Sequence, residues 1–172
     1  KVRDNKNTYK QRWKRGKKAR HMRQLRAKLR KGEKIKVCLF VSRINCWIYD
    51  DIYRILKESG KFEPVIVIKP FLSRGVEHMK ECMSSTYEAL LQRGYEPIKG
   101  YDEETDTYYN VREELNPDIV FYTKFWKPHF HPYFYIDRFL DKMTLLTDYG
   151  YYVDGHYGSI NFELQRMVDM YL

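Results

Sequence analysis

One segment in the second half of the chain gathers side chains that can bind a ligand or transfer a proton. Residues 124–133 read KFWKPHFHPY, so two histidines and two lysines alternate with aromatic rings and prolines. Proline restricts the backbone and holds neighbouring side chains at a low cost in conformational entropy. His129 and His131 are spaced as H-x-H, but no third histidine or carboxylate is close by in the sequence, which disfavours a metal site. These histidines are therefore either structural or ligand-contacting.

A second aromatic segment, 149–152, reads YGYY and follows the last predicted strand. If that strand neighbours the one before residues 124–133, the two segments lie side by side. His156 follows in an Asp-Gly-His turn, although Asp-Gly most often marks a turn without a catalytic role. Tyr149 and Tyr151 are the candidates for ligand contact here.

Arg43 is a candidate anion-binding residue because of its place between two predicted elements. It follows the buried segment 35–41 and precedes the helical pattern that starts at Trp47. A guanidinium beside the free N–H groups of a helix start suits a phosphate or a carboxylate. The alternative is an ordinary surface arginine.

The elements that position these residues alternate between strand and helix. Short, fully apolar runs such as IKVCLFV and PVIVI are typical of strands that are buried on both faces of a sheet. Strands are predicted at 35–41, 64–68, 96–98, 118–122 and 144–147. Helices are predicted at 47–58, 76–92, 110–115 and 132–140, and the start of another at 161–172. This order predicts a three-layer α/β fold with a mainly parallel sheet, 35–172, which we expect to be truncated at its C-terminal end.

Several function classes lack their signatures. The loop after the first strand contains no glycine, so the G-x-G-x-x-G dinucleotide motif is missing, and the P-loop motif is absent as well. The first two predicted strands lead into Ser42-Arg43 and Lys69, not into the acids of a phosphoryl-accepting receiver. Three separated cysteines indicate neither a disulfide framework nor a zinc site. The longest apolar run is far shorter than the ~20 residues of a membrane-spanning helix. We therefore expect a cytoplasmic protein without a bound cofactor.

The basic arm, residues 1–34, carries most of the positive charge. Residues 1–36 contain seventeen of the 32 lysines and arginines and only two acids, so they carry +15 while the remaining chain carries −6. Such a segment attracts polyanions, either nucleic acid or an anionic bilayer. We expect 1–11 to be mobile and 12–31 to form a helix with Met22, Leu25 and Leu29 on one face. The polyanion-binding candidates are Arg12, Trp13, Lys14, Arg15, Lys17, Lys18, Arg20 and Arg23.

Three motifs in the second half resemble the amino-terminal domain of the CDP-glycerol glycerophosphotransferase family. They are NPDIVFY at 116–122, His131-Pro132 followed by tyrosines, and Leu145-Leu146 leading into Tyr149-Gly150-Tyr151. The resemblance follows the order of elements over about residues 35–172. Members of this family are GT-B transferases that build teichoic acid and related capsular polymers of the bacterial cell wall. Better studied members carry a W-H-G-T-P type motif where this chain has Asp148-Tyr149-Gly150-Tyr151, so the resemblance identifies no catalytic histidine.

The resemblance implies a Rossmann-like GT-B half that binds the acceptor, while a second half binds a CDP-linked, nucleotide-activated donor. It further implies a lipid-linked or polymeric acceptor and a peripheral position on the inner face of the cell membrane, held by the basic arm. In that setting Arg43 and Lys124 bind acceptor phosphate or the pyrophosphate of the lipid carrier. His131, Tyr149 and Tyr151 line the acceptor groove. This half alone is expected to bind without turnover.

The alternative is a non-enzymatic nucleic-acid-binding module. Tyr9, Trp13 and the arginines of the arm are able to stack on bases, and arginine-rich segments fold on RNA. The acidic balance of residues 37–172 makes nucleic acid the less favoured partner.

Overall fold

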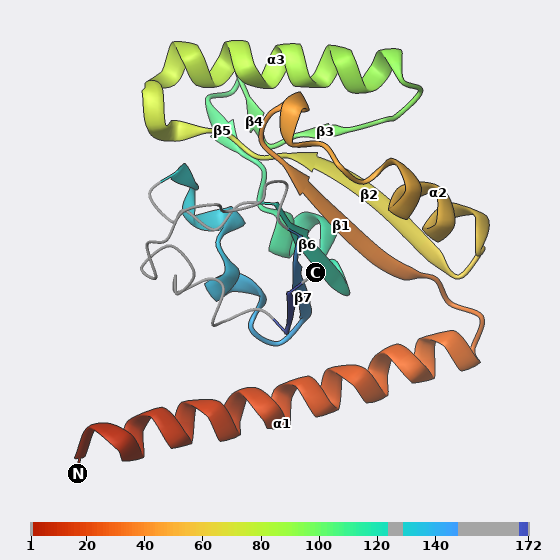
Figure 1. Ribbon diagram of the computed structural model, residues 1–172, viewed down its shortest axis with the longest axis vertical. Helices are drawn as coiled ribbons and strands as arrows, with labels where there is room; N and C mark the ends of the chain where they lie inside the picture. Colours follow the sequence, from red (N-terminus) through yellow and green to blue (C-terminus); the bar gives the residue numbers. More distant parts are fainter. Residues whose placement is uncertain (1, 124–128, 148–168, 172) are drawn as a thin grey trace, which may run out of the picture.

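The computed structural model describes residues 2–123, 129–147 and 169–171, and its centre is a parallel sheet (Figure 1). The strands are β1 (Ile35–Val41), β2 (Phe62–Ile68), β3 (Ile98–Lys99), β6 (Ile119–Tyr122), β7 (Met143–Leu146) and β8 (Met170–Tyr171). Their spatial order is β3-β2-β1-β6-β7-β8, and every neighbouring pair is parallel. The fold is therefore α/β with helices flanking a parallel sheet, and the strand order is compatible with a Rossmann-like fold.

The central strands are buried on both faces because their side chains alternate between two hydrophobic clusters. Val37, Leu39 and Val41 of β1 belong to the first cluster, whereas Cys38 and Phe40 belong to the second. This explains the near-continuous apolar sequence of β1, which has no polar face to present to water.

Two helices cover the first face. α2 (Asp50–Glu58) follows β1, and α3 (Val76–Gln92) follows β2. Met79, Met83 and Leu90 of α3 pack into the first cluster, at the helical spacing that the sequence predicted. α2 begins three residues later than predicted, because Trp47, which follows a 3-10 turn at 44–46, has an extended backbone.

The second face is covered by short turns instead of a long helix. A π-helix, Val111–Leu115, is followed after β6 by the 3-10 turns Pro132–Phe134 and Ile136–Phe139. The predicted helix at 132–140 is thus broken into two turns, separated by Tyr135 in an extended conformation. The large rings of this region fill the space that a regular helix would occupy.

A small antiparallel hairpin, β4 (Tyr101–Asp102) with β5 (Thr107–Tyr108), was not predicted from the sequence. Gly100 joins it to β3 at a crowded point. A Cβ atom on Gly100 would lie 2.5 Å from the carbonyl oxygen of Ile68 and 2.9 Å from the ring of Phe134. Glycine is therefore required here by close packing, and the contact fixes the hairpin against the loop that follows β2.

The basic arm lies in one long helix, α1 (Val2–Arg30), which includes the predicted helix at 12–30 and also residues 2–11. Figure 1 shows α1 running across one end of the molecule, with α3 and the hairpin at the other end. The predicted apolar face is only partly correct, because Leu25 is buried whereas Met22 and Leu29 are exposed. In the part of the chain that the structure describes, no helix combines the length and apolar character needed to cross a membrane.

The predicted helix at 161–172 falls largely outside the described residues. Its last part is described and differs from the prediction, because Met170 and Tyr171 form β8 beside β7. Apolar residues at the end of this segment suit a strand as well as a helix, and pairing with β7 decides between them.

Candidate functional site

The order of the strands in the sheet reverses between β1 and β6. β1 and β6 are neighbours, but the chain continues from β1 to β2 on one side and from β6 to β7 on the other. This is the topological switch point of the sheet, where a ligand crevice is expected. In open parallel sheets, ligands bind at this position.

Residues with buried hydroxyl groups end β6 or directly follow β1 and β6 at this switch point. Ser42 follows β1, Tyr122 ends β6 and Thr123 comes directly after it, and all three are buried. Their hydroxyl oxygens make no hydrogen bond to any described residue. A buried hydroxyl without a partner costs free energy, so these three groups are candidates for hydrogen bonds to a ligand or to residues outside the described ranges.

Arg43 brings positive charge to the same edge of the sheet. Its guanidinium lies 4.7 Å from the centre of the Phe71 ring, which belongs to the loop after β2. Phe71 also contacts the ring of His129 at 5.1 Å between centroids. The Nε atom of Arg43 is buried and has no hydrogen-bond partner among the described residues. Phe71 thus orients the guanidinium and leaves N–H donors for an anion.

A buried lysine lies beneath these residues. Lys69, directly after β2, has its ammonium nitrogen 3.6 Å from the centre of the Phe130 ring and 5.5 Å from the rings of Phe40 and Tyr122. Aromatic faces stabilise a cation that has left water. Arg43 and Lys69 thus place two basic side chains just after the carboxyl ends of β1 and β2.

Cys38 lies in the middle of β1, and burial raises the pKa of its thiol far above the ordinary range, although the charge of Lys69 acts in the opposite direction. Since the thiolate is the reactive form, Cys38 should resist alkylation at pH 8 in the folded protein. Cys46 is also buried, whereas Cys82 is half-buried. We predict that iodoacetamide followed by mass spectrometry will find modification of Cys82 alone before unfolding and of all three cysteines in urea. Early modification of Cys38 would contradict the buried position of β1.

His131 lies away from Arg43 and packs against the hairpin. Its ring is stacked on Tyr108 at 3.8 Å and 5°, and burial lowers the pKa of its imidazole. Its Nδ1 atom accepts a hydrogen bond from the backbone N–H of Tyr133. The structure therefore brings Arg43 together with His129, not with His131.

Tyr108 also lines a cleft of about 540 Å³ beside the hairpin. The other lining residues are tyrosines, carboxylates, one threonine and one lysine: Lys99, Tyr101, Asp102, Glu103, Glu104, Thr107, Tyr109 and Glu114. Four carboxylates against one ammonium repel phosphate. An anionic ligand is therefore expected at Arg43 and not in this cleft.

Lys124, Tyr149 and Tyr151 lie outside the described residues, and so do the side chains of Arg12, Trp13, Lys14 and Arg15. Residue-by-residue reasoning named His129 as a structural or ligand-contacting histidine but missed Phe71 and Thr123 as members of the site. The signal that points to them is position alone, because each lies in a segment that follows the carboxyl end of a central strand.

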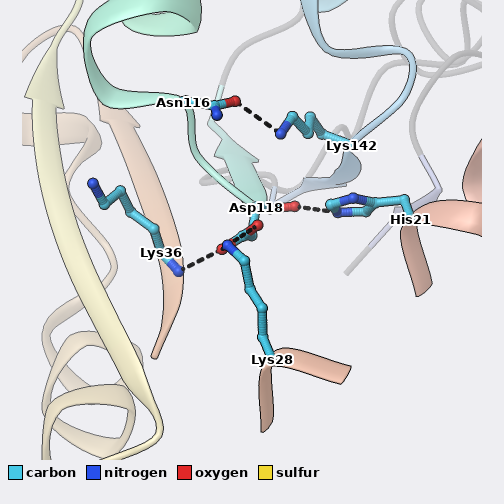
Figure 2. Close-up of polar contacts among 6 residues, drawn as sticks. All are labelled: His21, Lys28, Lys36, Asn116, Asp118 and Lys142. Atoms are coloured by element: carbon cyan, nitrogen blue, oxygen red, sulfur yellow. Dashed lines mark hydrogen bonds and ion pairs between the residues drawn. The ribbon is translucent and has the colours of Figure 1, made fainter. Parts of the chain in front are cut away.

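The opposite edge of the sheet holds a polar cluster around Asp118, at the start of β6 (Figure 2). Its buried carboxylate accepts hydrogen bonds from the Lys28 ammonium at 2.7 and 2.8 Å and from the backbone N–H of Lys36 at 3.0 Å. Its backbone carbonyl oxygen lies 2.7 Å from Nε2 of His21. Asp118 therefore joins α1 to both β1 and β6.

Comparisons of the chain with protein-family models, curated proteins and solved structures find no match. Among the described residues, no group of three or more histidine, cysteine or acidic side chains is arranged to hold a metal ion.

Proposed function

We propose that this chain is the acceptor-binding half of a glycosyl- or glycerophosphotransferase that builds a cell-surface polymer at the inner face of the cell membrane. A second half of GT-B type would hold the CDP-linked donor. The observation that carries this proposal is the set of residues Ser42, Arg43 and Thr123, which follow β1 and β6 at the switch point of the sheet. It combines a cation with hydroxyl groups that lack partners among the described residues.

The acceptor of such a transferase carries phosphate, and the crevice suits that chemistry. A guanidinium binds two phosphate oxygens at once, and neighbouring hydroxyls donate to the remaining oxygens. Arg43 would therefore bind the acceptor phosphate, while Ser42 and Thr123 would donate hydrogen bonds. Lys124, Tyr149 and Tyr151 belong to the same proposal as acceptor contacts, as does His131 at the side of the hairpin.

The resemblance over residues 35–172 supports this reading, and so does the strand order of the sheet. The basic helix α1 supports attachment to an anionic bilayer, because each cation near such a surface contributes roughly 1 kcal/mol of attraction. The acceptor would be lipid-linked or polymeric, and this half would bind it without turnover.

Arg43→Gln tests the proposal. We predict that the variant binds sn-glycerol 3-phosphate at least about tenfold more weakly than the parent protein, because it loses one charge-assisted, two-pronged contact. Isothermal titration at low salt measures this affinity. Arg93→Gln is the matched control, since Arg93 is exposed near the end of α3 and should leave binding unchanged. Equal losses in both variants, or no loss in either, would contradict a phosphate site at Arg43.

A further inference from the structure

α1 has a docked face and an outward face. Four residues at successive helical turns contact the rest of the protein: Lys18, His21, Leu25 and Lys28. Lys18 pairs with Asp169 and Lys28 pairs with Asp118, so acids of the sheet neutralise both inward cations. These cations hold the helix in place.

The outward face of α1 carries arginines. At 100° per residue, four of them point away from the docked face: Arg20, Arg23, Arg26 and Arg30. All four are exposed, and none has an ion pair with a described residue. Neighbours spaced by three or four residues lie about 5–6 Å apart on the helix surface. The outward face is therefore a row of guanidinium groups without an acidic partner in the described part of its own chain.

The other end of the molecule is acidic. Residues 102–114, which run from the hairpin into the π-helix, contain six acids and a single arginine. Four of these acids line the cleft of about 540 Å³ beside the hairpin, together with three tyrosines. Lys99 also lines the cleft, but its ammonium lies 4.9 Å from the centre of the Tyr87 ring on α3. The cleft is therefore suited to a cation.

Arginine fits such a cleft better than lysine does. A guanidinium pairs with both oxygens of a carboxylate and stacks on the face of a tyrosine ring, whereas an ammonium acts as a point charge. The cleft offers carboxylates and tyrosine rings side by side, and α1 offers a row of guanidinium groups. The two ends of the chain are thus complementary in charge and in side-chain chemistry.

One copy cannot join its own two ends. α1 is held at Asp118, at the amino end of β6, whereas the backbone N–H of Gly100 ties the hairpin to the carbonyl oxygen of Ile68, at the carboxyl end of β2. Seven residues of β1 at roughly 3.3 Å each separate these two edges of the sheet by about 23 Å. Figure 1 shows α1 at one end of the molecule and the hairpin at the other. The complementary surfaces can therefore meet only between copies.

We propose that the outward arginines of α1 bind in the acidic cleft of a second copy of this chain. Each copy contributes one α1 face and one cleft, so the contact is head-to-tail and builds a row of copies or closes into a ring. The contact does not involve Arg43, so it and the proposed phosphate site fail independently. An anionic bilayer would compete for the same arginines, so the association is measured in solution without lipid.

Sedimentation velocity over a series of protein concentrations tests the association itself. At low salt, we expect species larger than a monomer to form as the concentration rises. About 1 M salt, where the Debye length is about 3 Å, should return the protein to the monomer. A parent protein that stays monomeric at low salt, up to its limit of solubility, would overturn the proposal.

Two neutralised variants locate the contact. The arginine variant has glutamine at Arg20, Arg23, Arg26 and Arg30, and the cleft variant has glutamine at Glu103, Glu104 and Glu114. Each should self-associate about thirtyfold or more weakly than the parent.

Matched controls remove the same number of charges from exposed residues elsewhere. They carry glutamine at Lys57, Lys61, Arg74 and Arg93, or at Glu58, Glu63 and Glu81. Both controls should associate like the parent. Equal losses in a variant and in its control would overturn the assignment to these two surfaces.

Mixing the two variants is the sharpest test, because each keeps the surface that the other lacks. The intact α1 of the cleft variant should bind the intact cleft of the arginine variant. We expect a dimer with one copy of each variant, which grows no further because its two free ends are neutralised. A mixture that stays monomeric would overturn the head-to-tail contact, and so would parent-like association of either variant alone.

Discussion

Phe134→Ala is expected to lower the free energy of unfolding by about 3–5 kcal/mol, because it removes a large ring from a closely packed core. Phe134 is fully buried and packs edge-on against Phe40 of β1, with 5.8 Å between ring centroids. It also lies against Gly100, where the hairpin leaves the sheet. The ring therefore connects three parts of the molecule, and the surrounding backbone has little freedom to close the cavity. Urea denaturation followed by circular dichroism measures the loss.

Phe134→Leu provides the control, because leucine keeps much of the apolar volume and should cost less than half as much. A loss below about 1 kcal/mol for Phe134→Ala would mean that the turns at 132–139 are not part of the core. The hairpin contact would then also need another explanation.

Asp118→Ala is expected to destabilise the protein by about 3 kcal/mol and to release α1. The change leaves the Lys28 ammonium and the backbone N–H of Lys36 without their acceptor. Removing one partner of a buried ion pair costs more than the pair contributes, because the other partner stays desolvated. Lys28 is 37% exposed, which places the expected loss at the lower end of the range for such pairs.

Two measurements together check this result. Urea denaturation gives the stability, and limited trypsin digestion after Lys31 and Lys34 reports the release of α1. Asp51→Ala is the matched control, because Asp51 is 85% exposed and pairs with Arg54 at the surface. That change should cost less than about 0.5 kcal/mol and leave digestion unaltered. Resistance of Asp118→Ala to trypsin at the parent level would contradict the role of Asp118 in docking.

The strands were predictable because their apolar sequences indicate burial on both faces of a sheet. Apolar runs such as 35–41 have no polar face, so they fit only a sheet that is covered on both sides, and the structure confirms this for β1. The helix 76–92 was equally clear from its periodicity. Turns on the second face were not predictable, since Ile136, Phe139 and Leu140 have the i, i+3, i+4 spacing of a helix. Tertiary packing of the rings decides the outcome there.

The location of the candidate site was predictable from the sequence, but the contacts between its residues were not. The place of Arg43 between the first predicted strand and the next helix indicated an anion-binding residue there. It did not indicate that Phe71 holds the guanidinium, because that contact joins residues 28 positions apart in the sequence. The docking of α1 was hidden for the same reason. Lys28 and Asp118 are 90 residues apart, and nothing in the basic arm distinguishes a docking lysine from a surface one.

Chemical-shift mapping during titration with sn-glycerol 3-phosphate tests the central claim most directly. In a ¹⁵N-labelled sample at low salt, we predict that the largest shifts belong to the backbone amides of Ser42, Arg43, Phe71 and Thr123, at the carboxyl edge of the sheet. Arg43→Gln should abolish these shifts without changing the spectrum elsewhere. Shifts that centre on α1 or on the cleft beside the hairpin, and that persist in Arg43→Gln, would contradict a phosphate-binding crevice between β1 and β6.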